Sequence, residues 1–218
     1  MNLAHGEAAV NDVKAFYRKV WREYDDPLWH PVTASCLEVQ SRLLAACLER
    51  RRPRRILDLG CGPAPVLRPG QAPLVVSADL IHEMLAEIRR RLGCSAVCLD
   101  ARVLPFRNQS FDFVWGGLLV DHVAEVGTWV EELARVVRSG GTLGLACWDR
   151  SLLPRDRYPQ DRSMRYTCST GQELDVPSYP NWTEAVEELR RLDPDLALDS
   201  QPVVPGQYEL QVAFATIR

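Results

Sequence analysis

The chain has 218 residues, of which 46% are hydrophobic and 25% are charged, and its formal net charge is −3. This composition is that of a folded globular protein rather than a disordered one, and the negative charge excludes a general attraction for nucleic acid. No apolar run approaches the roughly 18 residues that span a bilayer. Because Met1–Val10 lacks a basic stretch followed by an apolar one, we expect a cytoplasmic protein without a membrane segment.

The N-terminal segment is rich in aromatic side chains and leads into a predicted helix over residues 34–49, where apolar residues recur at helical spacing. Tyr17, Trp21 and Tyr24 also fit one helical face. Two interpretations stay open for this region. The aromatic side chains form a lid over a flat substrate, with Tyr24 and His30 as candidate site residues, or they pack a helix against the core.

A strand-like run, Ile56–Leu59, ends in a turn that contains Gly60 and Gly62. Glycines in such a turn let backbone amides approach a ligand closely. Asp58 lies just ahead of the first glycine, where its carboxylate would repel the pyrophosphate that dinucleotide-binding turns receive. The stretch therefore favours a nucleoside cofactor that carries positive charge, whereas a tight strand-to-helix connection that binds nothing would show the same glycines.

Two further predicted strands, over residues 74–79 and 95–100, also end on an aspartate. The steps from Asp58 to Asp79 and from Asp79 to Asp100 are both 21 residues, the length of one strand with its crossover helix and turns. Parallel neighbours bring the three carboxyl groups to one sheet edge, which is where open α/β sheets bind ligands. A single aspartate after a strand is more often a cap or turn residue, but three in register favour a site.

The other elements alternate along the chain. We expect a short irregular helix across the proline-rich residues 63–73, a helix over 81–92, a strand over 111–117, a helix from Val126 that Gly140-Gly141 stops, and a strand over 142–148. Further on, we expect a small hairpin around Gly171, a helix that Asn181 and Glu184 cap and that ends near Leu192, and two β segments at 197–204 and 208–217. No linker divides the chain, so one domain over residues 1–218 is expected.

Several ordered motifs together resemble the class I S-adenosylmethionine-dependent methyltransferases of the small, widely distributed type. The motifs cover roughly residues 50–150 and are, in chain order, Ile56 to Ala64, Ala78-Asp79-Leu80, Asp100-Ala101, Leu104-Pro105-Phe106, Ser110-Phe111-Asp112, Asp121-His122-Val123 and Leu133 to Val137 with Gly140-Gly141. The resemblance implies an α/β fold with a doubly wound, mostly parallel seven-stranded sheet and an antiparallel last strand. Its expected parts are an N-terminal helical lid (1–50), a cofactor-binding core (51–148), a substrate-covering insertion (149–180), and a C-terminal helix and hairpin (181–218).

The resemblance also implies S-adenosylmethionine as the cofactor and assigns its contacts. Gly60 and Gly62 would pass the methionine part while Asp58 orients the glycine loop, Asp79 would hold the ribose hydroxyls, and Asp100 would hold the adenine. The remaining expected contacts are the neighbouring residues Cys61, Leu80, Ala101 and Gly116.

The implied reaction is attack of a substrate nucleophile on the sulfonium methyl group, with methyl transfer to O, N or C. His122 matches a family position that often holds a histidine near the site, and we expect it to act as a catalytic base, since hydroxyl substrates need one while amines need only be neutral. The alternative is a helix-start histidine bonded to backbone. The compact insertion favours a small-molecule substrate; nothing in the sequence fixes an oligomeric state.

Some positions depart from the family pattern: Ala64 replaces the usual third glycine, Ser139 replaces a proline, and prolines interrupt the first crossover. Three alternatives therefore stay open. The chain binds S-adenosylmethionine without methylating, as in a cyclase or partner subunit; it methylates RNA through the arginines of residues 50–55; or it is a nicotinamide-binding oxidoreductase. We regard nucleic acid as an improbable partner because those arginines suit a helix C-terminus and solvent.

The cysteine pattern points to reduced thiols. Seven cysteines form no Cys-x-x-Cys pair, and most of them lie in apolar segments. Cys94, Cys98 and His82 match no usual zinc spacing, so no metal is expected.

Overall fold

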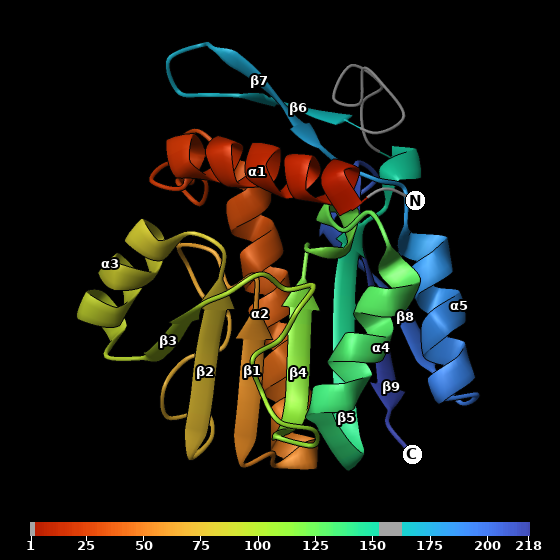
Figure 1. The fold of residues 1–218 in the computed structure, drawn as a ribbon. Helices are drawn as coiled ribbons and strands as arrows, with labels where there is room; N and C mark the ends of the chain where they lie inside the picture. Colours follow the sequence, from red (N-terminus) through yellow and green to blue (C-terminus); the bar gives the residue numbers. More distant parts are fainter. Residues whose placement is uncertain (1–2, 153–162) are drawn as a thin grey trace.

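A computed structural model describes residues 3–152 and 163–218 of the chain (Figure 1). Its centre is a seven-stranded sheet with the order β3-β2-β1-β4-β5-β9-β8. The strands are β1 (Arg55–Leu59), β2 (Leu74–Asp79), β3 (Ser95–Cys98), β4 (Phe111–Gly117), β5 (Val137–Trp148), β8 (Ala197–Val204) and β9 (Tyr208–Thr216). Neighbouring strands from β3 to β5 pair in parallel, whereas β9 is antiparallel to both β5 and β8. The predicted doubly wound sheet with an antiparallel last strand is confirmed.

Helices cover both faces of this sheet. They are α2 (Pro31–Arg51), α3 (His82–Leu92), α4 (Val126–Val136) and α5 (Trp182–Leu192), with short 3-10 turns at η1 (Val120–His122) and η2 (Arg150–Leu152). One apolar core packs Trp129 of α4 and Leu189 of α5 against the sheet, and a second packs Leu44 of α2 against the other face. Because both faces are covered, the central strands are mostly apolar, and the buried carboxyl group of Asp58 in β1 needs explaining.

The long helix α1 (Leu3–Val20) lies across the carboxyl ends of the strands, beside the hairpin of β6 (Ser163–Thr167) and β7 (Glu173–Pro177) (Figure 1). Phe16 and Val20 of α1 pack with Tyr166 and Val176 of the hairpin in a cluster separate from the sheet cores. The hairpin predicted around Gly171 is confirmed. The expected insertion 149–180 is described only in part, since residues 153–162 lie outside the described residues.

The proline-rich connection departs from the prediction. A helix of one or two turns was expected across residues 63–73, but the described chain forms only turns and bends between β1 and β2. The prolines at 63, 65, 69 and 73 lack the amide hydrogens that a helix needs, and Gly70 loses more conformational freedom in a helix than any other residue would. The connection is instead held by side-chain acceptors, as where Arg68 N donates to Gln71 Oε1 at 2.5 Å.

Two predicted boundaries and one predicted cap were also wrong. The strand β3 ends at Cys98, so Asp100 lies in the loop beyond it. Helix α4 ends at Val136 rather than at the glycines, because Val137 already pairs with Phe111 and the glycines continue β5. Asn181 precedes α5 but makes no side-chain cap; its amide donates to the carbonyl of Val123. In the last two cases a partner distant in sequence decided the local conformation.

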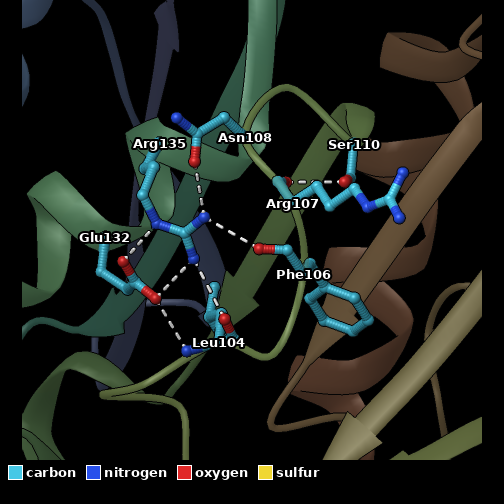
Figure 2. A network of polar contacts seen from close by, with 7 residues as sticks. All are labelled: Leu104, Phe106, Arg107, Asn108, Ser110, Glu132 and Arg135. Atoms are coloured by element: carbon cyan, nitrogen blue, oxygen red, sulfur yellow. Dashed lines mark hydrogen bonds and ion pairs between the residues drawn. The ribbon is translucent and has the colours of Figure 1, made fainter.

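The loop after Asp100 is tied to α4 by one arginine (Figure 2). Arg135 donates to the carbonyls of Leu104 at 3.0 Å and Phe106 at 2.8 Å, and its guanidinium pairs with Glu132 at 2.6 Å. Glu132 in turn accepts from Leu104 N at 2.8 Å. Carbonyls that would otherwise lack partners are thus satisfied, and the loop that carries Asp100 is fixed to a helix of the core.

Candidate active site

A cavity opens at the carboxyl edge of the sheet, below α1. Asp58, Asp79 and Asp100 all line it, together with the glycine loop, so the structure brings the three predicted carboxylates to one place. Its empty volume, the open mouth included, is about 1170 Å³. The lining is mostly apolar, so its few polar groups have a large influence on which ligand can bind. The described residues that line it include Val10, Val13, Tyr17 and Tyr24 from the N-terminal segment.

The glycine loop is shaped for a close approach by a ligand. Gly60 and Gly62 have φ values of 65° and 63°, in the left-handed region that favours glycine. A Cβ on Gly60 would meet the Leu119 side chain at 3.2 Å, whereas at Gly62 it would point into open space. The loop is pinned to β2, since Cys61 N donates to Ala78 O at 3.1 Å and Gly62 N to Asp79 Oδ2 at 3.1 Å.

Asp58 is a buried carboxylate with little to balance it. Its exposed fraction is 1%, and among the described residues its hydrogen bond comes from Leu67 N at a long 3.4 Å. Burial raises the pKa of Asp58 to about 7, with the nearby Asp79 adding to the rise against the opposing Leu67 bond. A carboxylate this poorly paired is stabilised by a cation in the cavity, so the donor set fits a positively charged ligand.

Asp79 and Asp100 differ in how they are held. Asp79 accepts from two backbone amides, Gly62 N and Ile81 N, each at 3.1 Å, yet burial still raises its pKa. Asp100 is paired with Arg102 at 2.7 Å. Although burial works against it, the hydrogen bonds from Arg102 keep the pKa of Asp100 below its ordinary value. Asp79 is the carboxylate fixed most directly by the glycine loop.

Another part of the lining, which we call the aromatic wall, consists of Tyr17, Tyr24 and His122. Tyr17 Oη lies 2.8 Å from Nε2 of His122, and Nδ1 of His122 lies 2.8 Å from the carbonyl of Pro177 in β7. Burial lowers the pKa of His122, against the opposing effects of Pro177 and Asp121. Burial also raises the pKa of Tyr17, helped by Tyr24, so both groups are neutral at neutral pH.

The structure places some of the other candidate residues in the lining of the cavity and others outside it. Cys61, Leu80 and Ala101 line the cavity as expected, but Gly116 does not, because it faces Leu145 and Trp129 on the α4 side. Gly117 lines the cavity instead, together with Trp115, as the two-residue period of a strand requires. That alternation could have identified Gly117 from the sequence.

Of the two N-terminal candidates, only Tyr24 lines the cavity. His30 stacks on Tyr166 of the hairpin and lies 2.6 Å from its hydroxyl, away from the lining residues. Phe16 and Trp21 are buried in packing. The packing interpretation therefore holds for Phe16 and Trp21, whereas a lid over a substrate stays a prediction for Tyr17 and Tyr24, which line the cavity.

The arginine-rich segment lies at the other edge of the sheet. Residues 50–55 join the end of α2 to the start of β1, and so lie at the amino ends of the strands (Figure 1). There Asp112 accepts from the backbone amides of Arg54 and Arg55, each at 2.8 Å. This separation gives the RNA alternative no support. Over the described residues, no group of three or more His, Cys, Asp and Glu side chains is placed to hold a metal ion, and no helix is long and apolar enough to cross a membrane.

Comparison with known proteins finds a matching family model and related sequences. Residues 57–145 match the family model described as methyltransferase domain. The chain is 36% identical over 117 residues to malonyl-[acyl-carrier protein] O-methyltransferase of Enterobacter lignolyticus, a match that covers 52% of this chain and 47% of that protein. The chain thus spans about half the length of the curated relatives it matches.

Solved structures with the same fold cover nearly the whole chain. One is the PH0226 protein of Pyrococcus horikoshii, with a TM-score of 0.65, 20% identity, and 94% of this chain and 99% of that chain covered. Another is 1,6-didemethyltoxoflavin-N1-methyltransferase of Burkholderia thailandensis, with a TM-score of 0.61, 19% identity, and 99% and 92% covered. At these identities the likeness concerns the fold.

Proposed function

We propose, from the premise that the chain belongs to the class I S-adenosylmethionine-dependent methyltransferases, that it transfers a methyl group from S-adenosylmethionine to a small molecule. The observation that carries the proposal is the convergence of Asp58, Asp79 and Asp100 on one cavity beside the glycine loop. The poorly paired carboxylate of Asp58 is the specific feature, because it would repel the pyrophosphate of a dinucleotide and attract a cationic nucleoside.

The residues present fit this cofactor. In this proposal Asp79 would accept from the ribose hydroxyls, Asp100 and the Ala101 amide would meet the adenine, and Asp58 would balance positive charge. Gly60 and Gly62 leave room for the methionine part, since a Cβ on Gly62 would occupy space that is open. When bound, S-adenosylmethionine supplies a methyl group on a positively charged sulfur that already is the leaving group.

The protein then has to align an acceptor, exclude water and manage a proton. Helix α1 covers the cavity and supplies Tyr17, while η1 supplies His122. We propose His122 as the base of the reaction, because its Nε2 is a neutral acceptor on the cavity wall. In this proposal α1 acts as the lid and the hairpin of the insertion supports it, whereas α2, which the expected lid 1–50 includes, belongs to the core.

The proposal is tested with two measurements on the full chain. Calorimetric titration should give saturable binding of S-adenosylhomocysteine and none of NADH; the reverse would identify a nicotinamide enzyme. Methyl-labelled S-adenosylmethionine, incubated with the protein and a metabolite extract of the organism that carries the gene, should then yield a labelled small molecule. Tight cofactor binding without labelled product would favour the non-methylating alternative. In a parallel reaction with total RNA of the same organism, label in the RNA would favour the RNA methyltransferase alternative.

A further inference from the structure

The aromatic wall contains a directed chain of hydrogen bonds. A backbone carbonyl can only accept, so the 2.8 Å contact with Pro177 O requires that Nδ1 of His122 carries the ring proton. Nε2 is then an acceptor, and the Tyr17 hydroxyl at 2.8 Å must donate to it. The chain of donors runs from Tyr17 through His122 to Pro177, which fixes both the tautomer and the orientation of the ring.

This direction places Tyr17 in front of the histidine. The only polar hydrogen of Tyr17 is engaged with Nε2, so its other partners must donate to the hydroxyl. Tyr24 hydrogen-bonds this hydroxyl, which leaves one of the two lone pairs for a further donor. Because burial raises the pKa of Tyr17, a standing phenolate is disfavoured, and the hydroxyl can gain a proton only while passing its own proton to His122. Asp121, buried beside the ring and an acceptor for Cys147 Sγ at 3.2 Å, favours the cationic ring that results.

The charge of the cavity limits the acceptor as well. Among the described lining residues the only Lys or Arg is Arg102, and its guanidinium pairs with Asp100 at 2.7 Å. Three carboxylates line the same space. An anionic acceptor such as a carboxylate would be repelled there, and it carries no proton for the Tyr17–His122 pair to remove.

We infer that the acceptor is a hydroxyl group on an uncharged molecule and that Tyr17 takes its proton, an inference that rests on the proposed function. The new O–CH3 bond forms as the S–CH3 bond breaks and leaves its electron pair on sulfur. The hydroxyl proton passes to Oη of Tyr17, and the Tyr17 proton passes to Nε2 of His122. A neutral amine could attack first and lose its proton afterwards, so it would not require this relay.

The class of the labelled product tests the inference without knowledge of the substrate. Product from the labelled extract is treated with mild alkali, which releases labelled methanol from methyl esters and leaves ethers intact, and is passed over a cation exchanger at acid pH. A base-stable product that is not retained, and that releases its label as methyl iodide in hot hydriodic acid, supports a hydroxyl acceptor; a label that resists this cleavage marks transfer to carbon and overturns this inference. Release of methanol, or retention as an amine, overturns this inference and leaves methyl transfer standing, whereas the absence of labelled product beside bound cofactor overturns the proposed function itself.

Two variants test the relay with that product as the readout. Tyr17→Phe keeps the ring that contacts Phe16 at 4.9 Å between centroids and removes only the hydroxyl; kcat should fall by roughly 10²- to 10⁴-fold, with KM and S-adenosylhomocysteine affinity nearly unchanged. Tyr166→Phe is the matched control, since it removes the hydroxyl that contacts His30 in the same cluster. Equal losses in both variants, or a loss confined to KM, would contradict the relay.

The pH profile separates chemistry from structure. The titratable groups that face Tyr17 are Tyr24, Asp79 and Asp121, and those that face His122 are Tyr17 and Asp121. The charge on these groups therefore influences the pH at which the His122 ring gains a proton. Since burial lowers the pKa of His122 below 6.5, wild-type kcat should fall on the acid side as Nε2 gains a proton. That fall should disappear in His122→Gln, whose residual rate stays low throughout. An acid fall that persists unchanged in the variant would show that His122 only supports the wall.

Discussion

The two walls of the cavity are built in different ways. The carboxylate wall comes from one stretch of chain, Asp58 to Asp100, in which consecutive strands lie next to one another. The aromatic wall joins Tyr17 to His122 across 105 residues, and His122 to Pro177 across 55. The first wall follows from local order in the sequence, and the second exists only once α1 and the hairpin have docked on the sheet.

The walls also differ in charge, and this difference separates their tasks. The carboxylate wall carries negative charge that a cationic cofactor can balance, while the aromatic wall offers hydroxyl and imidazole groups that move protons without attracting ions. A substitution on the carboxylate wall should therefore change cofactor affinity, and a substitution on the aromatic wall should change turnover. Variants that changed both alike would contradict this division.

The largest effect on the cofactor side is expected from Asp79→Ala. Loss of charge-assisted hydrogen bonds to the ribose should weaken S-adenosylhomocysteine binding by about 1–3 kcal/mol, roughly 5- to 150-fold. Titration calorimetry measures the change directly. Asp195→Ala, which removes a carboxylate whose side chain is 88% exposed, is the control and should leave affinity unchanged. If Asp79→Ala binds as tightly as the control, the ribose lies elsewhere.

A second effect on cofactor affinity should follow pH. Burial raises the folded-state pKa of Asp58 to about 7, so the carboxyl group is mainly neutral below that pH and must lose its proton to balance a cation. Affinity for S-adenosylmethionine should therefore rise with pH by up to about tenfold per unit between pH 5 and 7 and level off above. Asp79, whose pKa burial also raises, adds to the slope with the same sign.

Calorimetry in two buffers of different ionisation enthalpy reads this proton directly. At pH 6 binding to the wild type should release protons, and Asp58→Asn should release fewer and show a shallower rise with pH. Because the variant cannot ionise at this position, its affinity at pH 7.5 should also be lower. An identical proton release in both proteins would assign the titration to another group.

The contrast between the walls also explains what the sequence could predict. The carboxylates, the glycine loop and the strand order follow from local patterns, since spacing and apolar runs determine parallel neighbours. The helix predicted after Gly62 failed because prolines outweighed the family pattern, and the cap predicted at Asn181 failed because its amide found Val123 O instead. The pairing of Tyr17 with His122 has no local signal, since a helical face specifies which residues point inward but not what they meet.

The smallest effect concerns how the carboxylate wall is anchored. Arg135 holds two loop carbonyls, Asn108 and Glu132, and its side chain is 31% exposed. Within the described residues, Arg191 pairs with Glu188 alone, from a side chain that is 70% exposed. Both are arginines three residues after a glutamate on a helix, so the comparison isolates the loop contacts. Arg135→Ala should lower the free energy of unfolding by about 1 kcal/mol and Arg191→Ala by less than about 0.5 kcal/mol, a difference of roughly 2–4 °C in Tm for a chain of this size. Because the anchored loop carries Asp100 and Ala101, Arg135→Ala should also weaken cofactor binding a few-fold, and Arg191→Ala should not. If the two variants melted together and bound the cofactor equally well, the loop would owe its position to apolar packing of Leu104 and Phe106 alone.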